Sequence, residues 1–232
     1  MKKIVPVLLF TALLAGCDVL KSLPQSSVFS QQEATLGIKE ALGQGLTKAV
    51  LQLNKQDGFF GDGFYKILLP PDAQKIEQTL RDIGLNKMVD KAILQINRGA
   101  EDAAGYAKPI FVDAIKNITV SDAIGLVKNG DTSITHFFRE KTTAKLIAAF
   151  LPVIKTSLNK VEATKYYSDM VTTYNSFPTS FKKLNPDLQS YVTNKTTEAL
   201  FNLLAKEELN IRTNFGARSS EILKKVFGSF GF

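Results

Sequence analysis

The stretch that decides the fold is residues 86–107, which read NKMVDKAILQINRGAEDAAGYA. Its apolar residues recur every three or four positions, which is the spacing of one face of an α-helix. This face consists of Val89, Ile93, Ile96, Ala100, Ala103, Ala104 and Ala107. Because its second half is entirely alanine, another helix must approach it closely. The stretch therefore predicts a long helix that is packed against a second helix.

The same spacing recurs through most of the chain. We expect helices over residues 30–53, 72–83, 86–107, 119–128, 132–140, 143–158, 162–175 and 218–227, with two more opening at Pro109 and Pro186. No ladder of strands and no internal repeat is detectable. The pattern predicts an all-α fold, a single compact domain of eight to ten helices.

Local signals mark several boundaries. Ser30-Gln31-Gln32-Glu33 has the pattern of a capping box, so a helix should begin there. Residues 64–69, which end at Pro70-Pro71, are expected to be a short extended piece. Pro152 lies inside the apolar pattern of residues 143–158 and should kink or split that helix.

The first seventeen residues have the pattern of a lipoprotein signal. Two lysines precede an apolar run at positions 4–14, which is too short to span a bilayer and suits a secretory signal. The run ends in Leu14-Ala15-Gly16-Cys17, which resembles the lipobox of bacterial lipoproteins. That resemblance implies attachment of a diacylglyceryl group to the sulfur of Cys17 and cleavage before it.

These features divide the chain into three parts. Residues 1–16 are a cleaved signal peptide, residues 17–29 are the lipidated cysteine with a flexible tether, and residues 30–232 are the helical domain. Asp18 resembles an inner-membrane retention signal of enteric bacteria, a rule that other phyla do not share. We expect a cell-envelope location outside the cytoplasm, with the outer membrane favoured over the inner.

Composition excludes several classes of site. The chain has a net charge of +7, one cysteine and one histidine. A mild positive charge without a basic run containing aromatic residues does not indicate nucleic-acid binding. A Cys/His metal site cannot be built, and no cofactor is indicated. His136 precedes two phenylalanines, which indicates a place on a helix face rather than in a catalytic site, and no catalytic residue is singled out.

Two short stretches carry candidate polar residues. Asn97, Arg98 and Glu101 share a helix face or lie next to it, and Glu208 and Arg212 form an i,i+4 pair. The simplest interpretation of both stretches is a set of solvated salt bridges worth a few tenths of a kcal/mol each. The alternative is a polar pocket between helices. Its members would be Asn97, Arg98, Glu101, Asp131, Glu208 and Arg212.

The order of several short motifs is similar to that of the DUF4197 family, envelope proteins of Gram-negative bacteria with no assigned biochemical function. The motifs are Gly37-Ile38-Lys39-Glu40-Ala41-Leu42, Ile67-Leu68-Leu69-Pro70, Asn97-Arg98-Gly99-Ala100-Glu101, Asp122-Ala123, Gly130-Asp131-Thr132, Phe150-Leu151-Pro152, Glu207-Glu208, Ile211-Arg212, and Arg218 followed by Leu223-Lys224-Lys225-Val226-Phe227. The resemblance covers about residues 35–228. It implies a helical fold and an envelope location, but no reaction, cofactor or catalytic residue.

Three functional hypotheses stay open at this point. The first is a non-enzymatic, lipid-anchored protein that binds an envelope protein, a lipid or a peptidoglycan component. The second is an enzyme or small-ligand receptor that uses the polar pocket. The third is a purely structural or stress-related lipoprotein.

Overall fold

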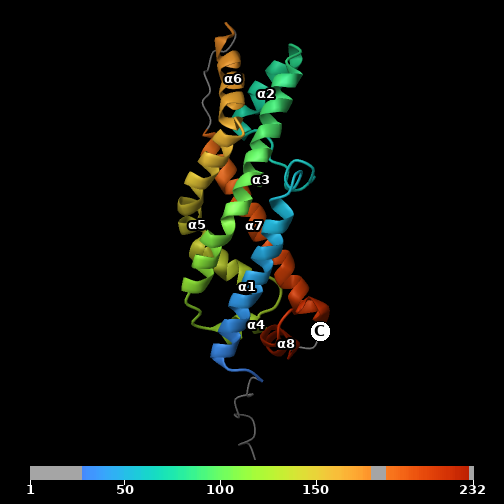
Figure 1. The fold of residues 1–232 in the computed structure, drawn as a ribbon, viewed down its shortest axis with the longest axis vertical. Helices are drawn as coiled ribbons and strands as arrows, with labels where there is room; N and C mark the ends of the chain where they lie inside the picture. Colours follow the sequence, from blue (N-terminus) through green and yellow to red (C-terminus); the bar gives the residue numbers. More distant parts are fainter. Residues whose placement is uncertain (1–27, 179–186, 230–232) are drawn as a thin grey trace, which may run out of the picture.

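The structure is a computed structural model that describes residues 28–178 and 187–229. This part of the chain forms eight α-helices and two short 3-10 helices in an elongated bundle (Figure 1). The predicted all-α, single-domain fold is confirmed. The predicted signal peptide, Cys17 and the tether as far as residue 27 lie outside the described residues.

The long helices run along the bundle and pack against one another. α3 packs against α1 and α5, and α7 packs against α1 and α5 as well. The elements are α1 (Gln31–Leu53), η2 (Pro71–Ala73), α2 (Gln74–Asp82), α3 (Asn86–Asn117), α4 (Ala123–Lys128), α5 (Ser133–Lys160), α6 (Ala163–Ser176), α7 (Leu188–Thr213), η3 (Phe215–Ala217) and α8 (Glu221–Gly228).

α1 begins as the capping-box pattern predicted. The Ser30 hydroxyl accepts a hydrogen bond from the Glu33 amide at 3.2 Å, and the Glu33 carboxylate accepts one from the Ser30 amide at 2.8 Å. Phe29, which the sequence placed at the end of the tether, is only 2% exposed. The packed domain therefore already includes the residue before the helix cap.

Glycines in α1 allow two neighbouring helices to come close. A Cβ atom on Gly37 would lie 2.9 Å from the side chain of Val226 in α8. A Cβ atom on Gly45 would lie 3.5 Å from Leu204 in α7. A Cβ atom on Gly43 would meet no other atom within 4 Å. Of these three glycines, Gly37 and Gly45 therefore serve close packing and Gly43 does not.

α3 runs without a break through Pro109, where we had predicted the start of a new helix. The proline lies on the exposed face, where the carbonyl group that loses its amide partner can be hydrated. On the opposite face Ala107, Phe111 and Ile115 are buried in one continuous row. Packing along this row outweighs the cost of the proline.

α5 is likewise one helix from Ser133 to Lys160, so the prediction of two helices over 132–140 and 143–158 was wrong. Pro152 is exposed and does not split it. Thr142, at the expected break, is buried and donates to the Phe138 carbonyl at 2.6 Å. The helix continues because that buried face continues.

The centre of the core is a cluster of three phenylalanines. Phe111, Phe138 and Phe201 come from α3, α5 and α7, and their ring centroids lie 5.8 to 6.4 Å apart. All three are fully buried, and such ring pairs add about 0.5–1.5 kcal/mol each beyond area burial. The cluster fixes the three longest helices to one another.

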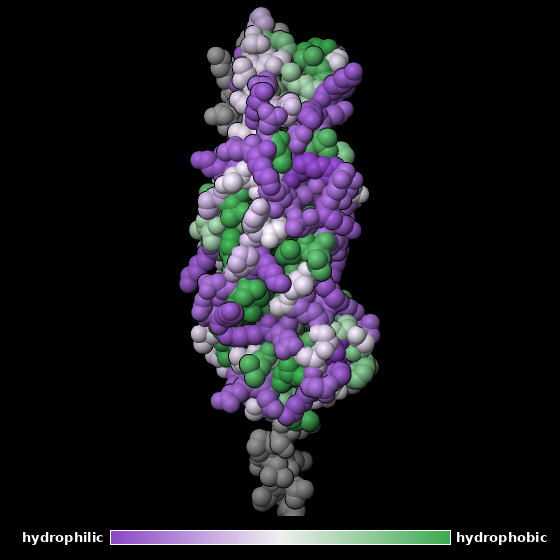
Figure 2. All heavy atoms as spheres, viewed as in Figure 1, coloured by the Kyte–Doolittle hydropathy of each residue, from purple (hydrophilic) through white to green (hydrophobic). Residues whose placement is uncertain are grey.

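The two ends of the bundle differ in what they contain. α1 begins at the end occupied by α4 and α8, whereas α2 and α6 lie at the opposite end (Figure 1). The face shown in Figure 2 is mostly hydrophilic, with hydrophobic residues in small separate patches. None of the helices in the described ranges is long and apolar enough to cross a membrane.

Candidate functional site

Asn97 joins α3 to the extended segment before η2. Its side-chain oxygen accepts from the Ile67 amide, and its side-chain nitrogen donates to the Ile67 carbonyl, both at 2.8 Å. The same nitrogen also donates to the Ile93 carbonyl at 2.8 Å. Asn97 is fully buried, so it pairs with the backbone as a neighbouring strand would.

Glu101, one turn further along α3, holds the loop that precedes this segment. Its carboxylate accepts from the amides of Phe59 and Phe60, both at 3.1 Å. Arg98 donates to Glu101 at 2.6 Å and to Asp57 at 2.8 Å. The hydrogen bond to Glu101 is the main reason that the pKa of Arg98 is raised; burial opposes it and Asp57 assists it.

Glu208 and Arg212 form a second network between α7 and the start of α5. The Glu208 carboxylate accepts from the amides of Ile134 at 3.0 Å and Thr135 at 2.6 Å. It also accepts from Arg212 Nε at 3.0 Å and Nη2 at 2.8 Å. Thr132, the residue at the N-cap of α5, makes no side-chain capping bond. Glu208 therefore caps α5 from another helix, with a negative charge at the positive end of the helix dipole.

The remaining N–H groups of Arg212 form hydrogen bonds with the segment that leads into α5. It donates to the Val127 carbonyl at 2.7 Å, the Leu126 carbonyl at 3.2 Å and the Ser133 hydroxyl at 3.1 Å. The side chains of Glu208 and Arg212 are only 3% and 4% exposed. The interpretation of this pair as a solvated surface salt bridge was wrong, because α4 and the start of α5 cover it.

Asp131 belongs to neither hydrogen-bonded group. It is exposed in the turn before α5, with a backbone φ of 42°. Within the described ranges it makes no ion pair with Arg98 or Arg212. The six candidates are thus divided between the α3 network, the α5–α7 network and an exposed turn, and no hydrogen bond among the described residues joins the two networks.

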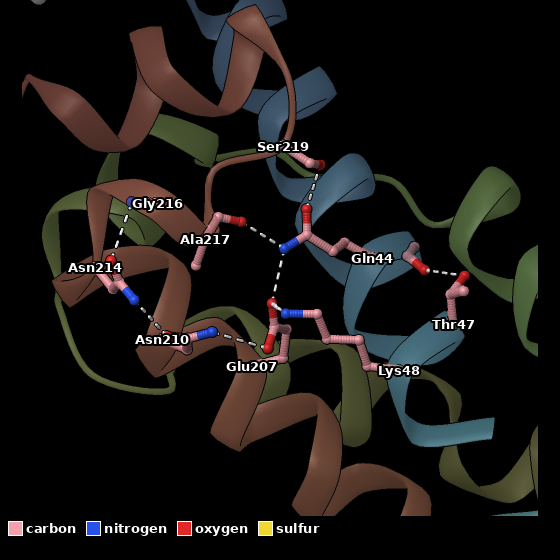
Figure 3. A network of polar contacts seen from close by, with 10 residues as sticks. Gln44, Thr47, Lys48, Glu207, Asn210, Asn214, Gly216, Ala217 and Ser219 are labelled. Carbon is pink, nitrogen blue, oxygen red and sulfur yellow. Dashed lines mark hydrogen bonds and ion pairs between the residues drawn. The ribbon is translucent and has the colours of Figure 1, made fainter. Parts of the chain in front are cut away.

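A third network, around Glu207, was not singled out from the sequence. Gln44 and Lys48 of α1 donate to the Glu207 carboxylate at 2.7 and 2.6 Å, and Asn210 donates at 3.1 Å (Figure 3). Gln44 also donates to the Ala217 carbonyl at 2.7 Å. The sequence signal that could have found this network is the pair of adjacent acids Glu207 and Glu208. Apolar residues flank the pair on α7, so the helix cannot direct both acids toward solvent.

The charge of Glu207 is held by its hydrogen-bond donors. Burial alone would raise the pKa of this carboxyl group, but the hydrogen bonds from Lys48, Gln44 and Asn210 outweigh burial and lower it. The network borders a shallow groove of about 550 Å³ between α1 and the segment after α7. The hydrogen bonds of the Glu207 network join α1, α7 and that segment, so the network holds these three parts of the fold together.

The comparison with protein families can now be set beside this geometry. The model of DUF4197, described as a protein of unknown function, matches residues 28–228. The chain belongs to the DUF4197 family. No curated protein and no solved structure matches it.

The DUF4197 match spans every helix from α1 to α8, so it includes all three buried networks. Among the residues that the structure describes, no three His, Cys, Asp or Glu side chains are grouped as metal ligands. The buried carboxylates of this DUF4197 protein instead accept hydrogen bonds from backbone amides, arginine, lysine and amide side chains. Such groups connect helices and loops at fixed positions.

Proposed function

We propose that this DUF4197 protein is a lipid-anchored cell-envelope protein, favouring the outer membrane, whose helical domain is a non-enzymatic binding module. The observation that carries the anchor is Leu14-Ala15-Gly16-Cys17, in which the one cysteine of the chain occupies the lipidation position. Two or three acyl chains would hold the protein stably, because one chain binds membranes only marginally.

The shape of the domain supports this arrangement. α1 begins at one end of the elongated bundle, and eleven residues separate Cys17 from Phe29. An extended chain of that length reaches at most about 40 Å. The end with α4 and α8 would therefore face the membrane, and the remainder of the bundle would project from it.

The hydrogen bonds of the candidate residues favour a binding role over a polar catalytic pocket. Glu101 and Glu208 each accept at least three hydrogen bonds from within the protein. Oxygens occupied in this way hold helices and loops together. The two carboxylates also belong to separate networks, so a single cleft shared by the six candidates has lost its main support.

Metabolic labelling tests the anchor. Full-length protein and the Cys17→Ser variant would be produced in a Gram-negative host with an alkyne-tagged fatty acid. We expect label and membrane association in the unsubstituted protein, and loss of both in Cys17→Ser, because no other cysteine can be acylated. An unlabelled protein released in soluble form would contradict the proposal. Separation of inner from outer membranes then tests the favoured location.

A further inference from the structure

Residues 66–69 belong to no helix, in a fold that is otherwise helical. They follow a turn at residues 63–65, where the Lys66 amide donates to the Asp62 carbonyl at 3.0 Å, so the extended piece predicted over 64–69 begins two residues later. The residues of this segment alternate between exposed and buried: Lys66 and Leu68 are exposed, whereas Ile67 and Leu69 are only 2% and 1% exposed. This alternation is that of a β-strand with one face in the core. The segment thus resembles an isolated strand on the surface of a helical bundle.

One edge of this isolated strand is paired and the other is open. Asn97 occupies both the amide and the carbonyl of Ile67. In an extended chain the amide and carbonyl of the next residue point the opposite way. Those groups on Leu68 have no hydrogen-bond partner among the described residues. The open edge therefore faces away from α3.

A groove of about 290 Å³ lies between the segment and the first half of α7. The α7 side of the groove consists of Tyr191, Lys195, Glu198, Ala199 and Asn202, which share one helix face. The opposite side consists of residues 66–68 of the segment, about 7 Å long, together with Phe64 and Tyr65 of the preceding turn, and the α7 side is about 17 Å long. The α7 side is long enough for roughly four residues of an extended peptide.

The charges and apolar groups around the groove define its ligand further. Lys66 and Lys195 line it, and its one acid, Glu198, is paired with Lys195 at 3.6 Å, so the lining has one net positive charge. The ammonium of Lys206 lies 5.3 Å from the centre of the Phe64 ring, which adds positive charge beside the strand. Phe64 and Leu68 offer exposed apolar side chains. A ligand with alternating acidic and apolar residues would therefore match both the positive charges and the apolar side chains of the groove.

We propose that this groove binds an extended acidic peptide by β-strand addition, with the peptide paired to the open edge at Leu68. Main-chain hydrogen bonds supply affinity in this mode of recognition, and pockets for alternate side chains supply specificity. The inference rests on the proposed binding role and names the class of partner, but it does not depend on acylation of Cys17. The groove lies along the first half of α7, away from the end at which α1 begins.

The test uses full-length protein purified from membranes in detergent and a fluorescent pentapeptide that alternates Glu and Val. Binding is followed by fluorescence anisotropy. Leu68→Pro removes the open amide, yet an exposed strand edge tolerates proline and Ile67 is already extended. Leu68→Ala is the matched control, because it shortens the side chain and keeps the amide. Thermal unfolding of each variant checks that the fold is kept.

We expect the Glu/Val peptide to bind, Leu68→Pro to weaken binding about tenfold, and Leu68→Ala to weaken it less. Lys195→Glu should weaken this peptide and strengthen a Lys/Val peptide of the same length. If Leu68→Pro does not fold, a peptide whose central amide is methylated tests the same pairing on the unsubstituted protein and should bind about tenfold more weakly.

Three results would overturn the inference. They are no binding of the Glu/Val peptide at millimolar concentration, equal binding of the Lys/Val peptide, or equal binding of the methylated peptide. A protein that is acylated at Cys17 and binds no peptide would refute this inference alone. A protein that binds the peptide and is not acylated would refute the anchor alone.

Discussion

Removal of the Glu208 carboxylate should destabilise the domain more than removal of any exposed carboxylate. In Glu208→Ala the amides of Ile134 and Thr135 lose their acceptor at the buried start of α5. Arg212 keeps its charge, is 4% exposed, and loses its counterion. Breaking a buried ion pair by removing one partner costs about 3–5 kcal/mol, so we expect a loss of that size.

The same helix offers a matched control. Glu198 of α7 forms an exposed i,i+3 pair with Lys195 at 3.6 Å. Its replacement by alanine should change the free energy of unfolding by less than about 0.5 kcal/mol. The double variant Glu208→Leu with Arg212→Met should lose less than the sum of the two single changes, because no charge is then left unpaired.

The assay is urea unfolding of the full-length protein in detergent, followed by far-ultraviolet circular dichroism. The reasoning would be refuted by a loss of under about 1 kcal/mol in Glu208→Ala, indistinguishable from that in Glu198→Ala, because a buried pair and an exposed pair would then be equivalent. Additive losses in the double variant would also contradict the coupling between Glu208 and Arg212.

Four further substitutions test other parts of the structure by the same unfolding assay. Gly43→Ala should stabilise α1 by about 0.5–1 kcal/mol through helix propensity, whereas Gly37→Ala should destabilise it because the new methyl group meets Val226; equal effects would contradict the packing. The hydrogen bonds that lower the pKa of Glu207 contribute stability that is present above its unfolded pKa of about 4.5 and is lost as the pH falls through the lowered pKa of the folded state. Glu207→Gln should therefore flatten the loss of stability below about pH 4.5, and an unchanged profile would contradict this. Asn97→Ala should cost about 2 kcal/mol and speed amide exchange in residues 64–69, and slow exchange there would show that another group holds the segment.

Signals confined to a few neighbouring residues predicted their part of the structure well. The capping box at Ser30 and Glu33 formed as expected, because both partners lie within one helical turn. The end of α4 at Lys128 also matches the end of the helix predicted over residues 119–128, although α4 begins only at Ala123. The alanine-rich half of α3 indicated close helix packing, and a Cβ atom on Gly99 would lie 2.6 Å from Leu158 of α5.

Signals from neighbouring residues could not predict the features that depend on residues far apart in the sequence. The sequence placed Glu208 beside Arg212 but could not show that the carboxylate caps a helix whose first turn lies 73 or 74 residues away. The predictions at Pro109 and Pro152 considered only the cost of a proline inside a helix, which is a lost backbone hydrogen bond and a steric clash. Both prolines lie on exposed faces of helices whose opposite faces are buried continuously, and that burial is a property of the assembled bundle.

The start of α1 and the end of α8 lie at one end of the bundle, which decides where a reporter can be attached. α1 begins and α8 ends near each other, so a fluorescent protein fused after α8 would lie at the end that we propose faces the membrane and would compete for space there (Figure 1). The turn between α2 and α3, where Gly84 has a φ of 85° and open space around it, lies at the other end. A small tag inserted there would stand about 48 Å away, the length of the 32 residues of α3, and would leave the end with α4 and α8 unobstructed.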